Sequence, residues 1–207
     1  MRYAELLLKQ YDRLGHDARS SLRKGSSRQK LNAALKRFLK QSHPVDEPLF
    51  PTTLPATLLD LYCWHDGGDA ELVPYFEFTT FNSALDSWDL TSEMTEDSVV
   101  YENGNAVYSD TSPFPILNHN NSDFIVMDVG ENSPTRGSIG TFSCSGTSTT
   151  RNEFKTLTQF FRAHYQCCRD GLYSVGEDCL EFNGKRKSLA QFRTDDVQMT
   201  NGASIGW

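Results

Sequence analysis

Lysine and arginine are missing from residues 44–135 of this 207-residue chain. The same stretch contains 17 Asp and Glu residues, whereas residues 1–43 contain 11 Lys and Arg against 3 Asp and Glu, a net charge of +8. An acidic surface attracts a cationic partner and repels nucleic acid. We therefore expect a protein partner with a basic surface and no direct binding to nucleic acid. The alternative is that the basic N-terminal residues fold back onto the acidic stretch and neutralise it.

Long apolar runs are also missing. No run reaches the roughly eighteen apolar residues that a transmembrane helix needs. Near the N-terminus the apolar run Leu6–Leu8 is short and has charged neighbours, unlike the apolar segment of a secretory signal peptide. We therefore expect a cytoplasmic protein that does not associate with a membrane.

Cysteines are few, and their spacing fits neither a disulfide framework nor a zinc site. There are 5, an odd number, and none are spaced as C-x-x-C. His164, Cys167 and Cys168 fall on one face of a predicted helix and offer three metal ligands. A structural zinc site needs a fourth, so a buried apolar role is favoured for the cysteines. We expect no metal and no cofactor.

A phosphate-binding loop is absent as well, because the stretch Ser145-Gly146-Thr147-Ser148 lacks the lysine and the glycine spacing of that motif. The densest group of titratable residues is His65-Asp66 with Asp69 and Glu71. A hydrolase could use His65 as a base and Asp66 to orient it. Neighbouring side chains at a helix end point in different directions, however, so the sequence favours a protein that is not an enzyme.

A second group, formed by His119, Asp123 and Asp128, has the composition of a calcium or hydrolytic cluster. Its spacing matches no calcium-binding loop. We interpret these three residues as polar residues of a turn and of strand edges.

Hydrophobic spacing predicts two basic helices within residues 1–43. Apolar residues recur at helical spacing from Tyr3 to Leu14, where Gly15 follows, and again from Leu31 to Phe38. The second helix is expected to end before Pro44. The polar stretch between the helices, His16 to Gln29, is interpreted as a connector. Residues 1–43 are therefore predicted to be a basic helical extension, which residues 45–51 link to a domain over 44–207.

Residues 44–207 alternate between helix and strand signals, which predicts an α+β fold with a mostly antiparallel central sheet flanked by helices. A helix begins at Pro55, with Thr52 and Thr53 as candidate caps, and Gly67-Gly68 ends it. Further predicted elements, in chain order, are a strand at Val73–Phe78, a helix capped by Thr80 and running through Trp88, a polar loop at Thr91–Asp97, a hairpin around Asn103-Gly104, strands at Phe124–Val129 and Ser138–Phe142, a helix at Phe154–Cys168 and a hairpin at Leu180–Lys187. Pro113 and Pro115 are expected to exclude a central strand.

The order of several short motifs resembles the Smi/Knr-like branch of the SUKH superfamily over roughly residues 50–207. The motifs are Leu54-Pro55, Trp64-His65-Asp66-Gly67-Gly68, Pro113-Phe114-Pro115-Ile116, the strand Asp123–Asp128, the helix Phe154–Tyr165 and Gly171-Leu172-Tyr173. This resemblance implies a SUKH-like α+β domain that binds a partner protein. In most members of the family the partner is a secreted bacterial toxin, which the immunity protein neutralises.

Charge and resemblance together predict an immunity protein that occludes the active site of a basic toxin acting in the cytoplasm, with a nuclease as the leading case. A regulatory scaffold of the fungal Smi/Knr type is the alternative. Aromatic residues are expected to anchor the interface, and carboxylates to accelerate encounter. The predicted partner-binding residues are Asp66, Asp69, Glu71, Tyr75, Glu77, Asp86, Asp89, Glu93, Glu96, Asp97 and Glu102.

Overall fold

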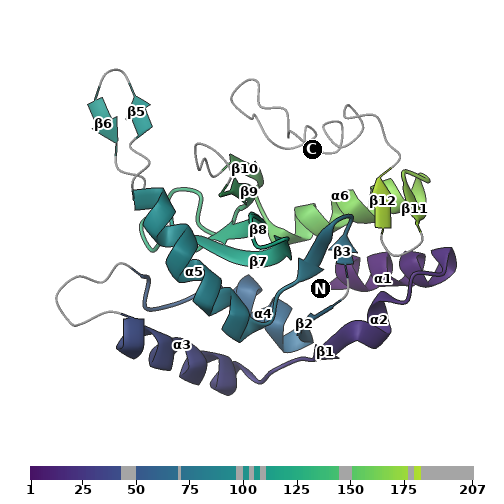
Figure 1. The fold of residues 1–207 in the computed structure, drawn as a ribbon, viewed down its shortest axis with the longest axis horizontal. Coiled ribbons are helices and arrows are strands. Elements are labelled where there is room, and N and C mark those ends of the chain that lie inside the picture. Colours follow the sequence, from purple (N-terminus) through teal and green to yellow (C-terminus); the bar gives the residue numbers. More distant parts are fainter. Residues whose placement is uncertain are drawn as a thin grey trace.

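A computed structural model describes residues 1–42, 50–69, 71–96, 100–102, 105–107, 111–144, 151–176 and 180–182 (Figure 1). Helices in this part of the chain are α1 (Arg2–Leu14), α2 (Ala18–Ser21), α3 (Arg28–Ser42), α4 (Ala56–Trp64), α5 (Phe81–Glu96) and α6 (Leu157–Arg169). The strands are β1 (Leu22–Lys24), β2 (His65–Gly68), β3 (Glu71–Val73), β4 (Phe76–Phe78), β5 (Val100–Glu102), β6 (Asn105–Val107), β7 (Pro113–His119), β8 (Asp123–Asp128), β9 (Ile139–Ser143), β10 (Arg151–Phe154), β11 (Tyr173–Val175) and β12 (Leu180–Phe182). The fold is α+β, as predicted.

A six-stranded antiparallel sheet in the order β10-β9-β8-β7-β4-β3 forms the centre of the molecule. The two continuous apolar runs predicted as central strands form β8 and β9, which pair along their length. Two-stranded pairs β1-β2, β5-β6 and β11-β12 accompany this sheet in the described residues. The β5-β6 pair confirms the hairpin predicted around Asn103-Gly104, with Glu102 opposite Asn105.

Strand β7 lies between β8 and β4, so the expectation that Pro113 and Pro115 exclude a central strand was wrong. The register explains how the prolines are tolerated. Pro113 is the first residue of the strand, and a bulge follows Pro115. Strand β4 pairs only with Leu117 and Asn118, beyond both prolines. First positions and bulges are the places in a sheet where a missing N–H costs least.

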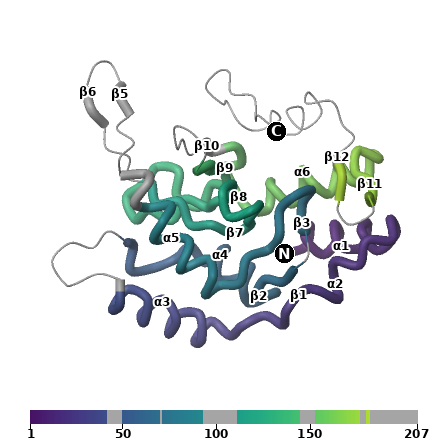
Figure 2. Tube along the Cα trace, in the orientation of Figure 1, coloured from purple at the N-terminus to yellow at the C-terminus, as the bar shows by residue number. Residues whose placement is uncertain are grey.

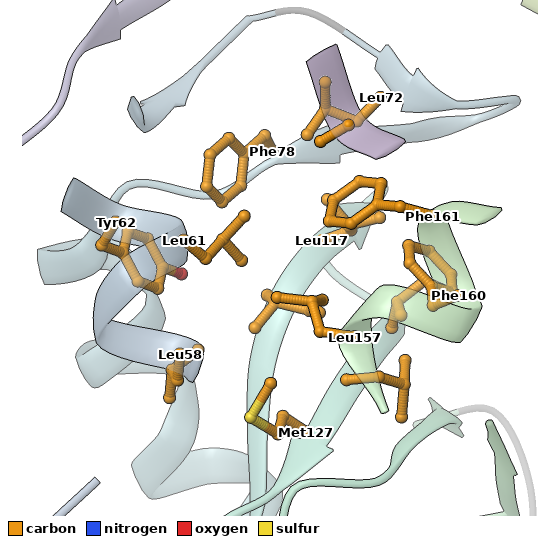
Figure 3. Packing of buried hydrophobic residues seen from close by; sticks show 14 of the residues in the cluster. Leu58, Leu61, Tyr62, Leu72, Phe78, Leu117, Met127, Leu157, Phe160 and Phe161 are labelled. Carbon is orange, nitrogen blue, oxygen red and sulfur yellow. The ribbon is translucent and has the colours of Figure 1, made fainter. Parts of the chain in front are cut away.

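The main hydrophobic core lies between one face of the sheet and helices α4 and α6, as Figure 3 shows. Leu58 and Tyr62 of α4 face Met127 of β8, and Phe160 of α6 closes the core from the other side. On the opposite face of β8, Phe124 and Val126 form a second, smaller cluster with Phe142 of β9. Both faces of the central strands are therefore buried, which accounts for their continuous apolar sequence.

The N-terminal helices pack directly on this core. Helix α1 lies against α6, and α3 lies against α4 and α5 (Figure 2). Leu31, Leu35 and Phe38 of α3 are buried, and the Phe38 ring stacks on Trp88 of α5 with ring centroids 5.9 Å apart. Residues 1–42 therefore contribute to the same core as the later elements. The division into two domains at residue 43 stays a prediction.

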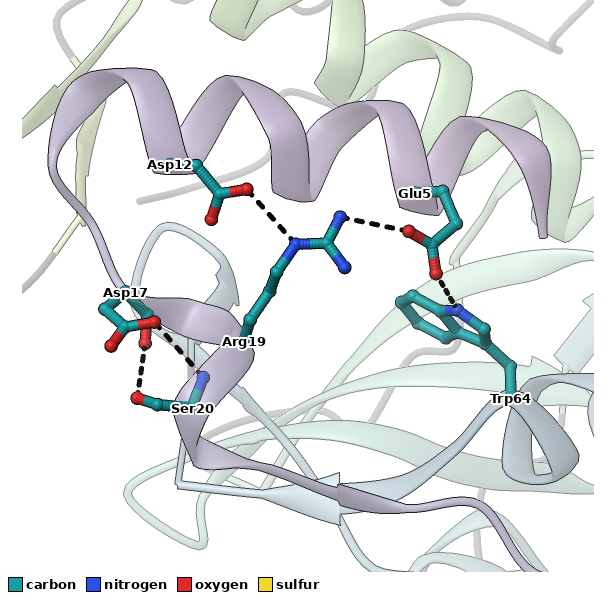
Figure 4. A network of polar contacts seen from close by, with 6 residues as sticks. All are labelled: Glu5, Asp12, Asp17, Arg19, Ser20 and Trp64. Atoms are coloured by element: carbon teal, nitrogen blue, oxygen red, sulfur yellow. Dashed lines mark hydrogen bonds and ion pairs between the residues drawn. The ribbon is translucent and has the colours of Figure 1, made fainter.

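The stretch between α1 and α3 is structured, contrary to the connector predicted for His16–Gln29. It forms the short helix α2, capped by the Asp17 side chain, and strand β1, which pairs with β2. Arg19 of α2 donates to Asp12 and Glu5 of α1, and the Glu5 carboxylate also accepts a hydrogen bond from the indole N–H of Trp64 (Figure 4). Burial opposes ionisation of Glu5, but the hydrogen bonds from Trp64 and Arg19 lower its pKa overall. This network joins α1, α2 and the end of α4.

Helix α4 is shorter at its end than predicted. It stops at Trp64, and residues 65–68 form β2 instead of a glycine cap. Gly67 does adopt the positive φ of 71° that the sequence predicted, but inside a strand. Pairing with β1 competes successfully with helix formation here. At the start of α4, Pro55 is the cap residue, while Thr52 hydrogen bonds to Glu131, so the predicted threonine caps were wrong.

Two further predictions change in detail. The strand predicted at Val73–Phe78 is a hairpin, β3-β4, that turns at Pro74-Tyr75. Helix α5 begins at the predicted cap, where the Thr80 hydroxyl accepts a hydrogen bond from the Ser83 N–H. The helix continues to Glu96, so the prediction of a loop at Thr91–Asp97 was wrong for residues 91–96.

The C-terminal predictions are confirmed in part. Helix α6 begins at Leu157, with Thr156 as its cap, and Phe154 belongs to β10 instead of to the helix. Strand β12 pairs with β11, and the remainder of the hairpin predicted at Leu180–Lys187 lies outside the described residues. So does most of the predicted linker at 45–51.

Candidate partner-binding surface

The predicted partner-binding residues lie on three neighbouring parts of the chain. Asp66 belongs to β2, and Asp69 follows that strand. Glu71, Tyr75 and Glu77 belong to the β3-β4 hairpin. Asp86 and Asp89 lie on α5, together with Glu93 and Glu96, and Glu102 lies on β5. The side chains of Glu93, Glu96 and Glu102 are outside the described part of the structure, as is Asp97 entirely.

Asp66 serves the fold and is not a free surface charge. Its Oδ1 accepts a 2.9 Å hydrogen bond from the N–H of Phe81, the first residue of α5. A negatively charged carboxylate at this position also interacts favourably with the positive end of the α5 helix dipole. Its Oδ2 accepts a 2.8 Å hydrogen bond from the Ser26 hydroxyl. Asp66 therefore ties the segment before α3 to the start of α5.

The hydrolase alternative requires Asp66 to orient His65, and the two side chains hydrogen bond elsewhere. The Nδ1 of His65 donates to the backbone oxygen of Arg23, at 2.9 Å. The carboxylate of Asp66 is occupied by Ser26 and Phe81. This geometry lacks the contact between base and orienting group that the hydrolase reading needs.

Within the β3-β4 hairpin, Glu71 and Glu77 lie opposite each other in the register. The turn between them places Tyr75 at a φ of 72°. A proline followed by a residue with positive φ is the arrangement of a type II turn, in which glycine or asparagine is usual at the second central position. A tyrosine with left-handed φ costs roughly 1–2 kcal/mol of conformational energy. Its side chain is nonetheless 39% exposed.

One side chain holds the backbone of Tyr75 in this conformation: Nδ1 of His119 donates a 2.7 Å hydrogen bond to the Tyr75 carbonyl oxygen. On the preceding strand, Glu71 accepts a 2.6 Å hydrogen bond from the Leu180 N–H. Burial raises the pKa of the Glu71 carboxyl, and the hydrogen bond from Leu180 only partly offsets that effect.

His119 is the last residue of β7, directly before the turn to β8. Its Nε2 accepts from the Asn120 side chain at 3.1 Å, so that Nδ1 is the donor to Tyr75. Its ring centroid lies 6.3 Å from that of Tyr75 and 5.6 Å from that of Phe76. The sequence analysis assigned His119 and its two neighbouring aspartates to a turn and to strand edges, and His119 does lie at a strand end, but its contact with the predicted surface was not predicted. Nothing in the sequence indicates this contact, because 44 residues separate His119 from Tyr75.

Among the described residues, few acidic side chains form an ion pair with the basic N-terminal residues. Asp69, Glu77 and Asp86 are exposed, and none of them forms an ion pair with a described residue. Among the ion pairs of the described residues, only Arg28–Asp60 joins residues 1–43 to residues 44–135. The alternative, in which the basic N-terminal residues fold back onto the acidic stretch, is therefore supported by a single ion pair among the described residues.

The second predicted group, His119 with Asp123 and Asp128, is divided between two roles. Asp123 lies directly opposite His119 at the end of the β7-β8 pair. Asp128 is fully buried, and its carboxylate accepts hydrogen bonds from Ser112 N at 3.1 Å, Gly130 N at 3.0 Å, Thr135 Oγ1 at 2.7 Å and the Ser133 hydroxyl. Asp128 therefore organises the loop between β8 and β9.

His164, Cys167 and Cys168 are all buried in α6. Nδ1 of His164 is hydrogen-bonded to the hydroxyl of Tyr173. Burial raises the pKa of the Cys167 thiol to about 12 and that of the Cys168 thiol to about 11, so both are protonated at neutral pH. Across the residues that the structure describes, no three His, Cys, Asp or Glu side chains gather as metal ligands.

The sequence matches no protein-family model and no curated protein. None of the described helices is long and apolar enough to cross a membrane.

Proposed function

We propose that this protein is an immunity protein that binds a basic toxin and blocks its active site. The observation that carries the proposal is the unpaired acidic surface. Asp69, Glu77 and Asp86 are exposed without a cation opposite them in the described structure, in a stretch of 92 residues that has no Lys or Arg. Retaining such a surface costs self-repulsion, which a cationic partner relieves on binding.

The mechanism is substrate mimicry combined with occlusion. A nuclease binds a polyanion in a basic cleft, and exposed carboxylates present the same sign of charge to that cleft. Long-range attraction accelerates encounter, while buried aromatic and apolar contacts determine how slowly the complex dissociates. Silencing a lethal enzyme requires a dissociation constant in the nanomolar range or below, about −12 kcal/mol. Neutralisation of a nuclease takes place in the cytoplasm, where we expect the complex to form.

The SUKH assignment is part of the same proposal. It rests on the order of the motifs along residues 50–207, and the α+β fold with its antiparallel sheet is compatible with it.

A pull-down from the organism that encodes the protein tests the proposal. The tagged full-length chain is incubated with lysate at low and at high salt, and the retained proteins are identified by mass spectrometry. We expect one basic toxin domain, whose association with the purified protein slows as salt rises. Recovery of several signalling or cell-wall proteins would instead favour the regulatory scaffold, and recovery of no basic protein would reject the immunity role.

Charge variants then locate the surface. Glu77→Gln with Asp86→Asn removes two exposed carboxylates from the proposed surface, and the association rate with the recovered toxin should fall about tenfold at low salt. The matched control, Asp17→Asn with Asp170→Asn, removes the same charge outside that surface while keeping an oxygen acceptor at each position. Equal losses in both double variants would mean that only net charge matters, and that no particular acidic face binds.

A further inference from the structure

Tyr75 is the described residue whose conformation is hardest to explain by folding alone. It has a φ of 72°, in a turn where glycine would be free of strain. Burial does not repay this strain, because 39% of the side chain remains exposed. Strained residues that a structure maintains are concentrated at functional sites. The tyrosine side chain must therefore contribute something that a glycine at this position would not.

The turn is built to keep this side chain in one place. His119 fixes the carbonyl oxygen of Tyr75 through Nδ1, and its ring lies against the Tyr75 ring with centroids 6.3 Å apart. His119 is itself held by the Asn120 side chain. The exposed residue is thus fixed by a side chain that is itself anchored. Such preorganisation lowers the entropy cost of using the ring in a contact.

Two carboxylates belong to the same hairpin as this ring. Glu77 is exposed two residues further along the hairpin, opposite the half-buried Glu71. A guanidinium group stacks on the face of a tyrosine ring and at the same time pairs with a nearby carboxylate. An arginine therefore fits this position better than an apolar side chain, which would leave Glu77 unpaired, or a lysine, which lacks a planar face.

We propose that Tyr75 is the aromatic anchor of the partner interface and receives an arginine side chain of a basic protein, with Glu77 as the pairing carboxylate. His119 is a positioning residue that holds the turn. This inference rests on the proposed function, because it specifies the contact through which the acidic surface binds.

Substitution by glycine separates the role of the ring from the stability of the fold. Tyr75→Gly removes the ring and relieves the positive-φ strain, so the melting temperature should stay the same or rise. Binding of a nona-arginine peptide, measured by calorimetry, should weaken at least fivefold. Tyr75→Phe keeps an aromatic face and should bind within twofold of the wild type. Leu14→Ala, at a side chain of similar exposure (41%) on α1, serves as the control and should leave binding unchanged.

The peptide comparison also tests the choice of arginine. Nona-lysine carries the same charge and should lose less affinity than nona-arginine when Tyr75 becomes glycine. If Tyr75→Gly binds nona-arginine within twofold of the wild type, the anchor is overturned. Equal losses for the two peptides would overturn the arginine assignment.

The outcomes for the two proposals are distinguishable. Recovery of a basic toxin whose affinity is unaffected by Tyr75→Gly would overturn the anchor and leave the immunity role standing. Loss of nona-arginine binding in Tyr75→Gly without recovery of any basic protein would reject the immunity role and retain an arginine-binding turn.

Discussion

The hydroxyl of Tyr11 donates a 2.9 Å hydrogen bond to the backbone oxygen of Leu72, 61 residues away. This contact joins the first helix to β3, the edge strand that carries the proposed surface. Tyr11 is fully buried, and burial raises the pKa of its hydroxyl well above the ordinary value, so it remains a donor at every physiological pH. Helix α1 thus supports the β3-β4 hairpin through this buried hydrogen bond.

Tyr11→Phe removes this hydrogen bond and leaves the Leu72 carbonyl oxygen without that donor. We expect a loss of about 1–2 kcal/mol in the free energy of unfolding, measured by urea denaturation. Tyr3→Phe is the control, because Tyr3 is only partly buried, its ring contacts Tyr165, and its hydroxyl forms no hydrogen bond with a described residue. That variant should change stability by less than about 0.5 kcal/mol. Equal losses in the two variants would refute a specific role for Tyr11.

Gly25 is required because the backbone before α3 passes very close to α4. A Cβ at Gly25 would lie 2.0 Å from the carbonyl oxygen of Cys63, and the neighbouring Ser26 N–H donates to Tyr62 O at 3.0 Å. Gly25→Ala must push these segments apart, and we expect a loss of more than about 2 kcal/mol by urea denaturation. The control, Gly15→Ala, meets no atom within 4 Å but has a φ of 83°, and should cost only about 1 kcal/mol. A smaller loss for Gly25→Ala than for Gly15→Ala would contradict the close approach.

Glu71 predicts a pH-dependent contribution to stability. Its pKa in the folded protein is raised above the ordinary value of 4.5, chiefly by burial, so the folded state binds the proton more tightly than the unfolded state. The contribution of Glu71 is therefore fully present below about pH 4.5 and is lost as pH rises through the raised pKa. Glu71→Gln abolishes this titration. The stability advantage of the wild type over Glu71→Gln should decrease from pH 4.5 to pH 7, by less than about 1 kcal/mol because the group is partly solvated.

Guanidinium chloride denaturation at several pH values measures this difference. Glu77→Gln provides the comparison, since Glu77 is exposed on the same hairpin. An advantage of the wild type over Glu71→Gln that grows toward neutral pH would have the wrong sign and would rule out a raised pKa for Glu71.

How far the sequence predicts this fold depends on whether a signal is local. The apolar runs of β8 and β9 and the helical stripe of α6 are contained in their own segments. Strands β8 and β9 form where predicted, and α6 does so from Leu157 onward. Strands β1 and β2 have no such signal. Residues 65–68 include two glycines and two polar residues, and they become a strand because β1 pairs with them. Strand β7 likewise depends on a bulge that only the register reveals.

The same distinction applies to the candidate surface. Composition identifies the carboxylates, and the structure divides them by role according to partners that are distant in sequence. Asp66 is held by Ser26, 40 residues earlier, and Glu71 by Leu180, 109 residues later. Glu77 and Asp86 remain exposed. No pattern of spacing separates these two groups, because the distinction arises only when the chain is folded.

Asp128 offers the sharpest test of a structural carboxylate, since it is buried and accepts hydrogen bonds at both oxygens. Its Oδ1 accepts from two backbone N–H groups, which cannot reverse their role, and its Oδ2 accepts from the hydroxyls of Ser133 and Thr135, which can rotate to become acceptors. Asp128→Asn can therefore keep its oxygen toward the N–H groups and donate to the hydroxyls, with a loss of about 2 kcal/mol from the weaker neutral hydrogen bonds.

Asp128→Leu has the same number and branching of side-chain heavy atoms but satisfies none of these donors, and it should cost roughly twice as much as Asp128→Asn, measured by urea denaturation. Asp123→Asn, at the partly exposed start of the same strand, should change stability by less than about 0.5 kcal/mol. If Asp128→Leu were no more destabilising than Asp128→Asn, the two backbone N–H groups would not depend on this carboxylate. The conformation of the loop after β8 would then depend on other contacts, such as those of Arg136 with Val129 and Thr53.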